Sequence, residues 1–371
     1  MRLNYVLTGV GVCLLGLMAV VSSCKKSEDD PAADFDKGPL LQNVGNNIII
    51  PNYQTLSLAV NKMDSAAMAF NAAPTVAALS DLRDFYKKAY RAWQYCSPYE
   101  FGPALTVHLR SNVNTYPASA SQITSNVSSG SYNLEAAINI SAKGFPALDY
   151  LLYGVAADEA GTVLKYTTDA DAAKRKQYLA DVSTNLKTNV TSTLNGWLPG
   201  NGNYINDFIS NAGTDAGSSL SDLVNQFIID YENLKNYKTG IPLGIQSGGT
   251  AFPEKVEAYY SGISSELALV QLKASRDLYL GKSNAGVDGV GFDDFLKQMG
   301  YSELDGNIQS QYTLAISKLE WVSDPLSYAI TNTPAVVNTA YVAIQQQVTL
   351  IKRQMSTAMN VRLTFTDGDG D

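Results

Sequence analysis

Residues able to carry out chemistry are few in this chain of 371 residues, and their types exclude several kinds of site. His108 is the single histidine, so a metal centre built from two or more imidazoles, as in most zinc hydrolases, is excluded. No Gly-x-Ser-x-Gly elbow for a hydrolase nucleophile occurs. The tripeptide 281–283 resembles the end of a phosphate-binding loop, but Arg276 stands where that loop needs its first glycine.

One segment, Lys143–Gly154, combines the signals of a short helix with a carboxylate. Pro146 suits the first turn, Gly154 suits the end, and Asp149 lies near the N-terminal turn, where the helix dipole favours negative charge. These signals are a sufficient structural reason for the segment, without any function.

The N-terminus is typical of a targeting signal rather than of a folded element. Residues 1–23 combine a basic start with a short apolar run, and the cysteine that follows, Cys24, completes a sequence that resembles a bacterial lipobox. The acidic stretch 28–30 is similar to the surface-export signal of Bacteroidetes lipoproteins. We therefore expect a signal peptide over 1–23, lipidation of Cys24, a flexible tether over 24–45, and a place at the outer-membrane surface.

The net charge of the chain limits its possible binding partners. Twenty-seven basic against thirty-five acidic side chains give a net charge of −8, which argues against a nucleic-acid partner because phosphate binding needs a basic surface.

Cys96 is the only thiol outside the first 24 residues. It has no intramolecular partner in the mature chain, so we expect a small buried apolar side chain.

Apolar periodicity predicts long helices beyond about residue 52. Residues 75–95, 171–194, 218–234 and 333–359 each repeat apolar positions at the spacing of one helical stripe. No run of strict alternation suggests a sheet of any size. The predicted fold is all-α, with two helical-bundle domains over 46–215 and 216–371.

A weak internal repeat supports two similar halves. Gly144-Phe145-Pro146-Ala147 and Gly240-Ile241-Pro242-Leu243 share the order glycine, apolar, proline, apolar. Both sit where a loop would lead into a helix, so each could mark the same point in two related bundles.

With these residues in view, the chain resembles the imelysin family, which includes proteins described as insulin-cleaving membrane peptidases and imelysin-like proteins implicated in bacterial iron uptake. That family carries a Gly-x-His-x-x-Glu motif, and here Gly144 matches the glycine, Pro146 replaces the histidine and Asp149 replaces the glutamate. The segments 91–93, 100–103 and 363–371 are also similar to family signatures. The resemblance extends over essentially the whole mature chain.

The resemblance implies two related helical bundles with a site at their interface, where Gly240–Pro242 would face Gly144–Pro146. On this basis the predicted cleft residues are Trp93, Glu100, Gly144, Pro146, Asp149, Gly240 and Pro242. Asp149 and Glu100 are the candidate metal ligands, and the candidate cofactor is iron or another hard cation. Proline has no lone pair with which to bind a metal or carry a proton, which weakens a peptidase assignment.

The resulting hypothesis is a lipid-anchored, non-enzymatic binding protein of the cell envelope that serves iron or haem acquisition. Its expected partners are the outer membrane, reached through the lipid anchor, and iron, haem or a membrane transport protein. The alternatives are a metal-dependent peptidase and a surface protein that binds a peptide, a glycan or another protein.

Overall fold

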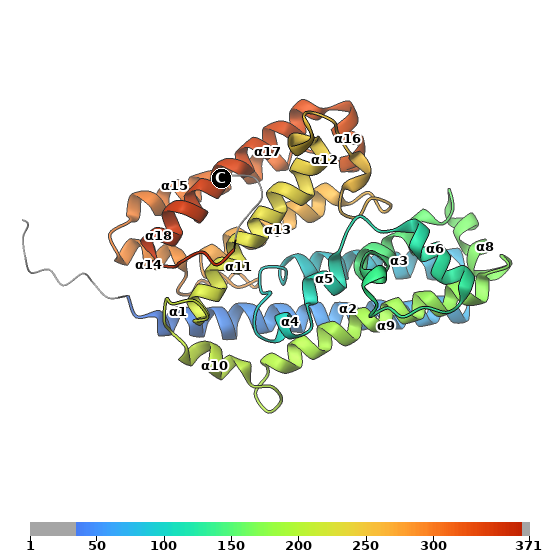
Figure 1. The fold of residues 1–371 in the computed structure, drawn as a ribbon, viewed down its shortest axis with the longest axis horizontal. Coiled ribbons are helices and arrows are strands. Elements are labelled where there is room, and N and C mark those ends of the chain that lie inside the picture. Colours follow the sequence, from blue (N-terminus) through green and yellow to red (C-terminus); the bar gives the residue numbers. More distant parts are fainter. Residues whose placement is uncertain (1–34, 366–371) are drawn as a thin grey trace, which may run out of the picture. The chain divides into compact units, whose positions relative to one another are not determined.

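The computed structural model describes residues 35–365, and this part of the chain is helical without a strand (Figure 1). The first half of it contains α1 (Lys37–Asn43), η1 (Val44–Ile49), α2 (Ile50–Ala72), α3 (Val76–Gln94), α4 (Pro103–Thr106), α5 (Leu109–Asn114), α6 (Ala120–Ser129), η2 (Ala137–Ala142), α7 (Gly144–Asp149), η3 (Tyr150–Gly154), α8 (Glu159–Thr167), α9 (Ala172–Trp197) and α10 (Tyr204–Ser210). The second half contains α11 (Ser219–Asn233), η4 (Leu234–Gly240), α12 (Ile241–Leu243), η5 (Ile245–Ser247), η6 (Pro253–Lys255), α13 (Ser264–Tyr279), α14 (Phe292–Gln298), α15 (Ser302–Leu319), α16 (Leu326–Asn332), α17 (Pro334–Val348), η7 (Thr349–Met355) and α18 (Ser356–Ala358). The all-α prediction is confirmed.

The long helices form where the apolar stripes predict them. In α9 the positions Leu179, Val182, Leu186 and Val190 are fully buried, as one stripe on a helix of 3.6 residues per turn requires. The helix α3 begins after Thr75, whose hydroxyl accepts a hydrogen bond from the Ala78 amide at 3.1 Å.

Two sets of helices pack side by side within the described residues. In the first, α2 packs along both α3 and α9, and α7 packs against α5 and α9. In the second, α15 packs against α13 and α17, and η4 contacts α13 and α17. The two sets meet where α3 contacts α13. Residues from Phe35 onward pack as one compact unit, so the proposed boundary between 215 and 216 stays a prediction.

Two helices widen into π-helical turns just before a proline. The segment η1 precedes Pro51 and η4 precedes Pro242. In each case the amide of the residue before the proline donates to the carbonyl five residues back, from Ile50 to Gly45 and from Ile241 to Asn236. Proline lacks an N–H and its ring clashes with the carbonyl four residues back, so a wider turn lets the helix continue through the proline.

The expected tether over 24–45 is wrong for the residues that the structure describes. Helix α1 already begins at Lys37, and the Asp36 carboxylate accepts a hydrogen bond from the Gly38 amide at 3.0 Å. Leu40 and Leu41 are fully buried in the core. The flanking Asp, Pro, Gly and Lys gave this segment a linker composition, but two adjacent leucines are enough to fix its helix to the bundle.

The predictions about the N-terminal targeting signal concern residues outside the described part of the chain. This applies to the signal peptide over 1–23, to lipidation at Cys24 and to the tether before residue 35. Within 35–365, no helix combines the length and the apolar character needed to cross a membrane.

A single core substitution tests whether residues 37–43 belong to the folded unit. Leu41→Ala removes a fully buried side chain and should lower the free energy of unfolding by about 2–5 kcal/mol, measured by chemical denaturation. Gln42→Ala, at an exposed position of the same helix, should change it by less than about 0.5 kcal/mol. Equal, small effects of both substitutions would show that this segment is a tether after all.

Candidate functional site

A polar pocket of about 320 Å³ lies where the end of α3 meets α5, the α11–η4 helix and α13. It is lined by Trp93, Gln94, Ser97, Arg110, Ser111, Asn114, Thr115, Tyr116, Asp230, Asn233, Tyr237, Lys238 and Gln271. We call it the polar pocket. A larger groove of about 460 Å³ runs between α2 and α3, but none of its lining residues is buried, so it offers no desolvated polar group to a ligand.

Secondary structure explains how the walls of the polar pocket form. Trp93 and Gln94 lie in the last turn of α3, whose buried stripe faces the core. Opposite, Asp230 in α11 and Lys238 in η4 are both buried. Asn233 at the end of α11, and Tyr237 and Lys238 in the π-helical turn η4, line the same pocket as the end of α3.

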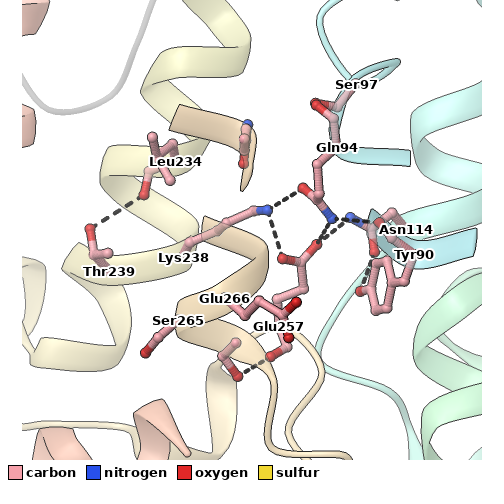
Figure 2. A network of polar contacts seen from close by, with 12 residues as sticks. Tyr90, Gln94, Ser97, Asn114, Leu234, Lys238, Thr239, Glu257, Ser265 and Glu266 are labelled. Carbon is pink, nitrogen blue, oxygen red and sulfur yellow. Dashed lines mark hydrogen bonds and ion pairs between the residues drawn. The ribbon is translucent and has the colours of Figure 1, made fainter. Parts of the chain in front are cut away.

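A buried ion pair of the second half of the chain makes hydrogen bonds to the first set of helices beside the pocket (Figure 2). The Lys238 ammonium lies 2.6 Å from the Glu257 carboxylate and donates to the Gln94 side-chain oxygen at 2.6 Å. The amide of Asn114 donates to the same carboxylate at 2.8 Å, and the Tyr90 hydroxyl donates to Asn114 at 2.6 Å. This network therefore ties α3, α5, η4 and the loop around residue 257 together.

Asp230 is the second buried carboxylate at the pocket. The Gln271 side-chain amide donates to its carboxylate at 2.8 Å and to its carbonyl at 3.1 Å. Burial raises the pKa of Asp230, while the positive charge of Arg110 and the hydrogen bond from Gln271 oppose that shift. The guanidinium of Arg110 itself donates to the Ser97 carbonyl at 2.8 Å.

Three polar atoms of the lining residues are buried without a hydrogen-bond partner among residues 35–365. They are the indole N–H of Trp93, the Nε–H of Arg110 and the side-chain oxygen of Gln271. Leaving such an atom unpaired costs about 1–3 kcal/mol. All three are closed off from solvent, so they lie behind the wall of the pocket rather than open to it. With the charged residues Arg110, Asp230 and Lys238 in its lining, this pocket is the candidate functional site.

The segment 143–154 forms α7 and η3 and lies at a second pocket of about 230 Å³, which we call the motif pocket. Pro146, Asp149, Glu254, Lys255 and Tyr260 are among its lining residues. Tyr116 lines both pockets, so the two adjoin at that side chain.

Gly144 has a conformational reason of its own. Its φ is +69°, and a Cβ atom there would lie 2.3 Å from the carbonyl oxygen of Val113 in α5. Only glycine allows both this backbone conformation and this close approach. The glycine of the motif thus fixes the packing of α7 on α5.

Asp149 acts as an acceptor for a turn rather than as an open ligand. It is buried, and its two oxygens accept hydrogen bonds from the Tyr260 amide at 2.7 Å, the Tyr86 hydroxyl at 3.0 Å and the Ser261 amide at 3.1 Å. Burial raises the pKa of Asp149 to about 6, although hydrogen bonds from Ser261, Tyr260 and Tyr86 counteract the rise.

The two candidate metal ligands do not share a site. The Glu100 carboxylate accepts a hydrogen bond from the Arg110 amide at 2.9 Å, whereas Asp149 caps the turn at 260–261. Within 35–365, no group of three or more His, Cys, Asp or Glu side chains is placed to hold a metal ion. The donor set around Asp149 and Glu100 therefore does not fit a resident iron centre.

The structure brings the predicted cleft residues only partly together. Trp93 lines the polar pocket, Pro146 and Asp149 line the motif pocket, and the remaining four line neither: Glu100, Gly144, Gly240 and Pro242. The carbonyl of Pro242 accepts a hydrogen bond from the Phe252 amide at 2.8 Å, and Pro146 lines the motif pocket together with Glu254. The proposed pseudo-symmetric facing of the two motifs stays a prediction.

His108 and Cys96 line neither the polar pocket nor the motif pocket. His108 is exposed, at the residue that precedes α5. Cys96 is buried, and burial raises the pKa of its thiol, so it behaves as an apolar side chain rather than as a nucleophile.

Sequence reasoning missed the charged residues at the polar pocket and their neutral partner: Arg110, Asp230 and Lys238 in its lining, Gln271 with them, and Glu257 paired with Lys238 beside it. In the sequence, only the apolar residues around two of them indicated that these charges are buried. Asp230 and Lys238 fall on the apolar side of α11–η4, among Phe227, Tyr231 and Leu234, where a surface charge is out of place.

Comparison with known proteins decides the family. The Imelysin family model matches residues 49–355. The chain belongs to the imelysin family. It is 20% identical to "Iron-regulated protein A" of Synechococcus elongatus over 357 residues, which cover 94% of this chain and 92% of that protein.

Two solved structures share the imelysin fold of this chain. A candidate iron-regulated protein A precursor from Parabacteroides distasonis superposes with a TM-score of 0.72 at 16% identity, covering 89% of this chain and 96% of that one. An imelysin-like protein from Psychrobacter arcticum superposes with a TM-score of 0.68 at 19% identity, covering 90% and 99%. At these identities the likeness establishes the fold alone.

The buried ion pair gives a prediction on stability. Lys238→Met leaves the Glu257 carboxylate buried without its counter-charge, so it should lower the free energy of unfolding by about 3–5 kcal/mol in denaturant titrations. The double variant Lys238→Met/Glu257→Gln removes both charges and should be less destabilised than the sum of the single variants. Lys273→Met, which breaks the exposed pair with Glu320, should cost less than about 1 kcal/mol. Additive effects at 238 and 257 would contradict a coupled pair.

The raised pKa of Asp149 gives a prediction on pH dependence. In the folded chain the Asp149 carboxyl keeps its proton up to about pH 6, whereas in the unfolded chain it loses the proton near its ordinary pKa of 3.8. The contribution of this carboxyl to stability is therefore largest below pH 3.8. The contribution should fall by about 3 kcal/mol as the pH rises to 6 and should then level off. The difference in unfolding free energy between wild type and Asp149→Asn should show this slope between pH 4 and 6. Asp215→Asn, at an exposed carboxylate, is the control. A flat difference for Asp149→Asn would contradict a shifted pKa.

Proposed function

We propose that this imelysin-family chain is a cell-envelope binding protein that captures a small polar ligand in the polar pocket and serves iron acquisition. The observation that carries this proposal is the pocket itself, whose lining brings together the charged residues Arg110, Asp230 and Lys238. Its volume of about 320 Å³ lies at the lower end of the range of about 300–1,000 Å³ for ligand sites, which favours a small polar molecule over haem.

Two further observations support binding over hydrolysis. Pro146 occupies the position of the motif histidine, and the oxygens of Asp149 accept hydrogen bonds from the backbone amides of the turn at 260–261.

The connection with iron comes from the name of the Synechococcus elongatus relative, which calls that protein iron-regulated. The lipobox at Cys24 supports a lipid anchor in the outer membrane, where a membrane transport protein would be the partner.

A growth experiment under iron limitation tests this function. Deletion of the gene should slow growth of the source bacterium at low iron, and the wild-type chain should restore it. Ser111→Trp places a large side chain at an exposed residue of the pocket wall, so it should fail to restore growth. Ser317→Trp, at an exposed serine of α15, should restore growth as well as the wild type.

Immunoblotting would confirm equal amounts of the variants in these strains. Normal growth of the deletion strain at low iron would overturn the link to iron. Restoration by Ser111→Trp would show that the polar pocket is not the site. Protein cleavage by the purified chain that disappears on Asp149→Ala would instead support the peptidase alternative.

A further inference from the structure

One further pocket, of about 160 Å³, differs in charge from the pockets described above. It lies where α6, η3, α8 and α9 meet, and its lining residues are Ile123, Thr124, Val127, Tyr150, Leu151, Val155, Lys165 and Arg175. We call it the basic pocket, because this lining contains two cations and no carboxylate. By contrast, carboxylates line the groove between α2 and α3, the polar pocket and the motif pocket, among them Asp81, Asp230 and Asp149.

Arg175 keeps donor groups that the described part of the chain does not use. Its Nη1 donates to the Lys165 carbonyl at 2.6 Å and to the Asp169 carboxylate at 3.2 Å, and these bonds hold the guanidinium in place. Its Nε and Nη2 have no hydrogen-bond partner within residues 35–365, and neither is among the side-chain atoms closed off from solvent. Together they form one edge of the guanidinium fork, which can bind two oxygen atoms of an oxyanion.

The charges beside the basic pocket favour an anion. The Lys165 ammonium lies 2.9 Å from the Asp169 carboxylate, and Arg175 Nη1 lies 3.2 Å from the same carboxylate. Two cations therefore share one counter-charge, and Asp169 is not itself a lining residue. The remaining positive charge would attract an anion in a chain whose net charge is −8.

A hydroxyl group adds an uncharged donor. The hydroxyl oxygens of Tyr150 and Thr124 lie 3.3 Å apart, and the Thr124 hydroxyl already donates to the Ala120 carbonyl at 2.8 Å. The proton of the Tyr150 hydroxyl can therefore turn from Thr124 to a ligand. Tyr150, Lys165 and Arg175 come from three different elements, η3, α8 and α9. A tetrahedral oxyanion can accept hydrogen bonds from several directions, whereas the acceptor sites of a carboxylate lie in one plane.

We propose that the basic pocket binds a phosphate group through Arg175, Lys165 and Tyr150. Its volume of about 160 Å³ equals that of about five water molecules in the liquid, and it lies below the range of about 300–1,000 Å³ for organic ligands. The pocket therefore has room for the phosphate group itself and for little else. It shares no lining residue with the polar pocket or the motif pocket, so this inference is independent of the proposed function.

Calorimetric titration of the purified chain at constant ionic strength tests the proposal. Inorganic phosphate should bind at the stoichiometry of one site. Malonate, which carries its two negative charges on planar carboxylates, should bind about tenfold more weakly or less. Glycerol phosphate distinguishes two sources of the group: affinity equal to that of inorganic phosphate assigns the phosphate of an ester, such as a lipid headgroup, and loss of binding assigns the free ion.

Three variants test whether phosphate binds at the basic pocket. Arg175→Gln and Lys165→Gln each remove one charged donor, so each should lower the affinity for phosphate about tenfold or more. Lys174→Gln is the matched control, because Lys174 is the neighbouring cation on α9, pairs with Asp171 at 3.7 Å and does not line the pocket. It should bind phosphate as the wild type does.

Thermal unfolding without phosphate checks that the variants fold. The Lys165 side chain is 40% exposed, so Lys165→Gln tests the site even where Arg175→Gln weakens the fold. Absence of phosphate binding overturns the proposal, and malonate binding as tight as that of phosphate overturns the ligand class. Unchanged affinity in folded Lys165→Gln and Arg175→Gln, or an equal loss in Lys174→Gln, overturns the placement at the basic pocket.

Discussion

The pocket depends on one buried interaction, the ion pair of Lys238 and Glu257. Each charge would cost several kcal/mol to bury alone, so the ammonium and the carboxylate require each other. Gln94 and Asn114 supply further hydrogen bonds to the pair, and they belong to α3 and α5. The two sets of helices are therefore held at a polar contact of defined geometry, and the neighbouring walls of the polar pocket are fixed by the same contact. Apolar packing alone would hold the helices together with less directional specificity.

Backbone geometry explains how a lysine reaches this position. Lys238 lies in a π-helical turn whose widening accommodates Pro242 four residues later. The Thr239 hydroxyl donates to the Lys235 carbonyl at 2.8 Å and so satisfies a backbone acceptor within that turn. A proline that looks like a loop signal in the sequence thus changes the register of side chains along a continuous helix, and the buried charge follows from that change.

The sequence predicted the helices well and the site poorly, for different physical reasons. Burial along α9 follows the helical period, so its apolar stripe could be read directly from positions such as Val182 and Leu186. The linker composition before residue 46 hid Leu40 and Leu41, because two apolar residues are too few for a periodic pattern. Lys238 and Gln94 lie 144 positions apart, and a charged residue carries no mark of a partner at that distance.

The residues at the family motif have structural roles in this chain. Gly144 keeps its packing role on α5 and needs no chemistry to explain it. Asp149 keeps a carboxylate but directs it to the backbone of the turn at 260–261, which forms one side of the motif pocket. Tyr116 separates that pocket from the polar pocket, whose lining contains Trp93, Arg110 and Gln271. In this chain, the motif therefore supports the walls of the region.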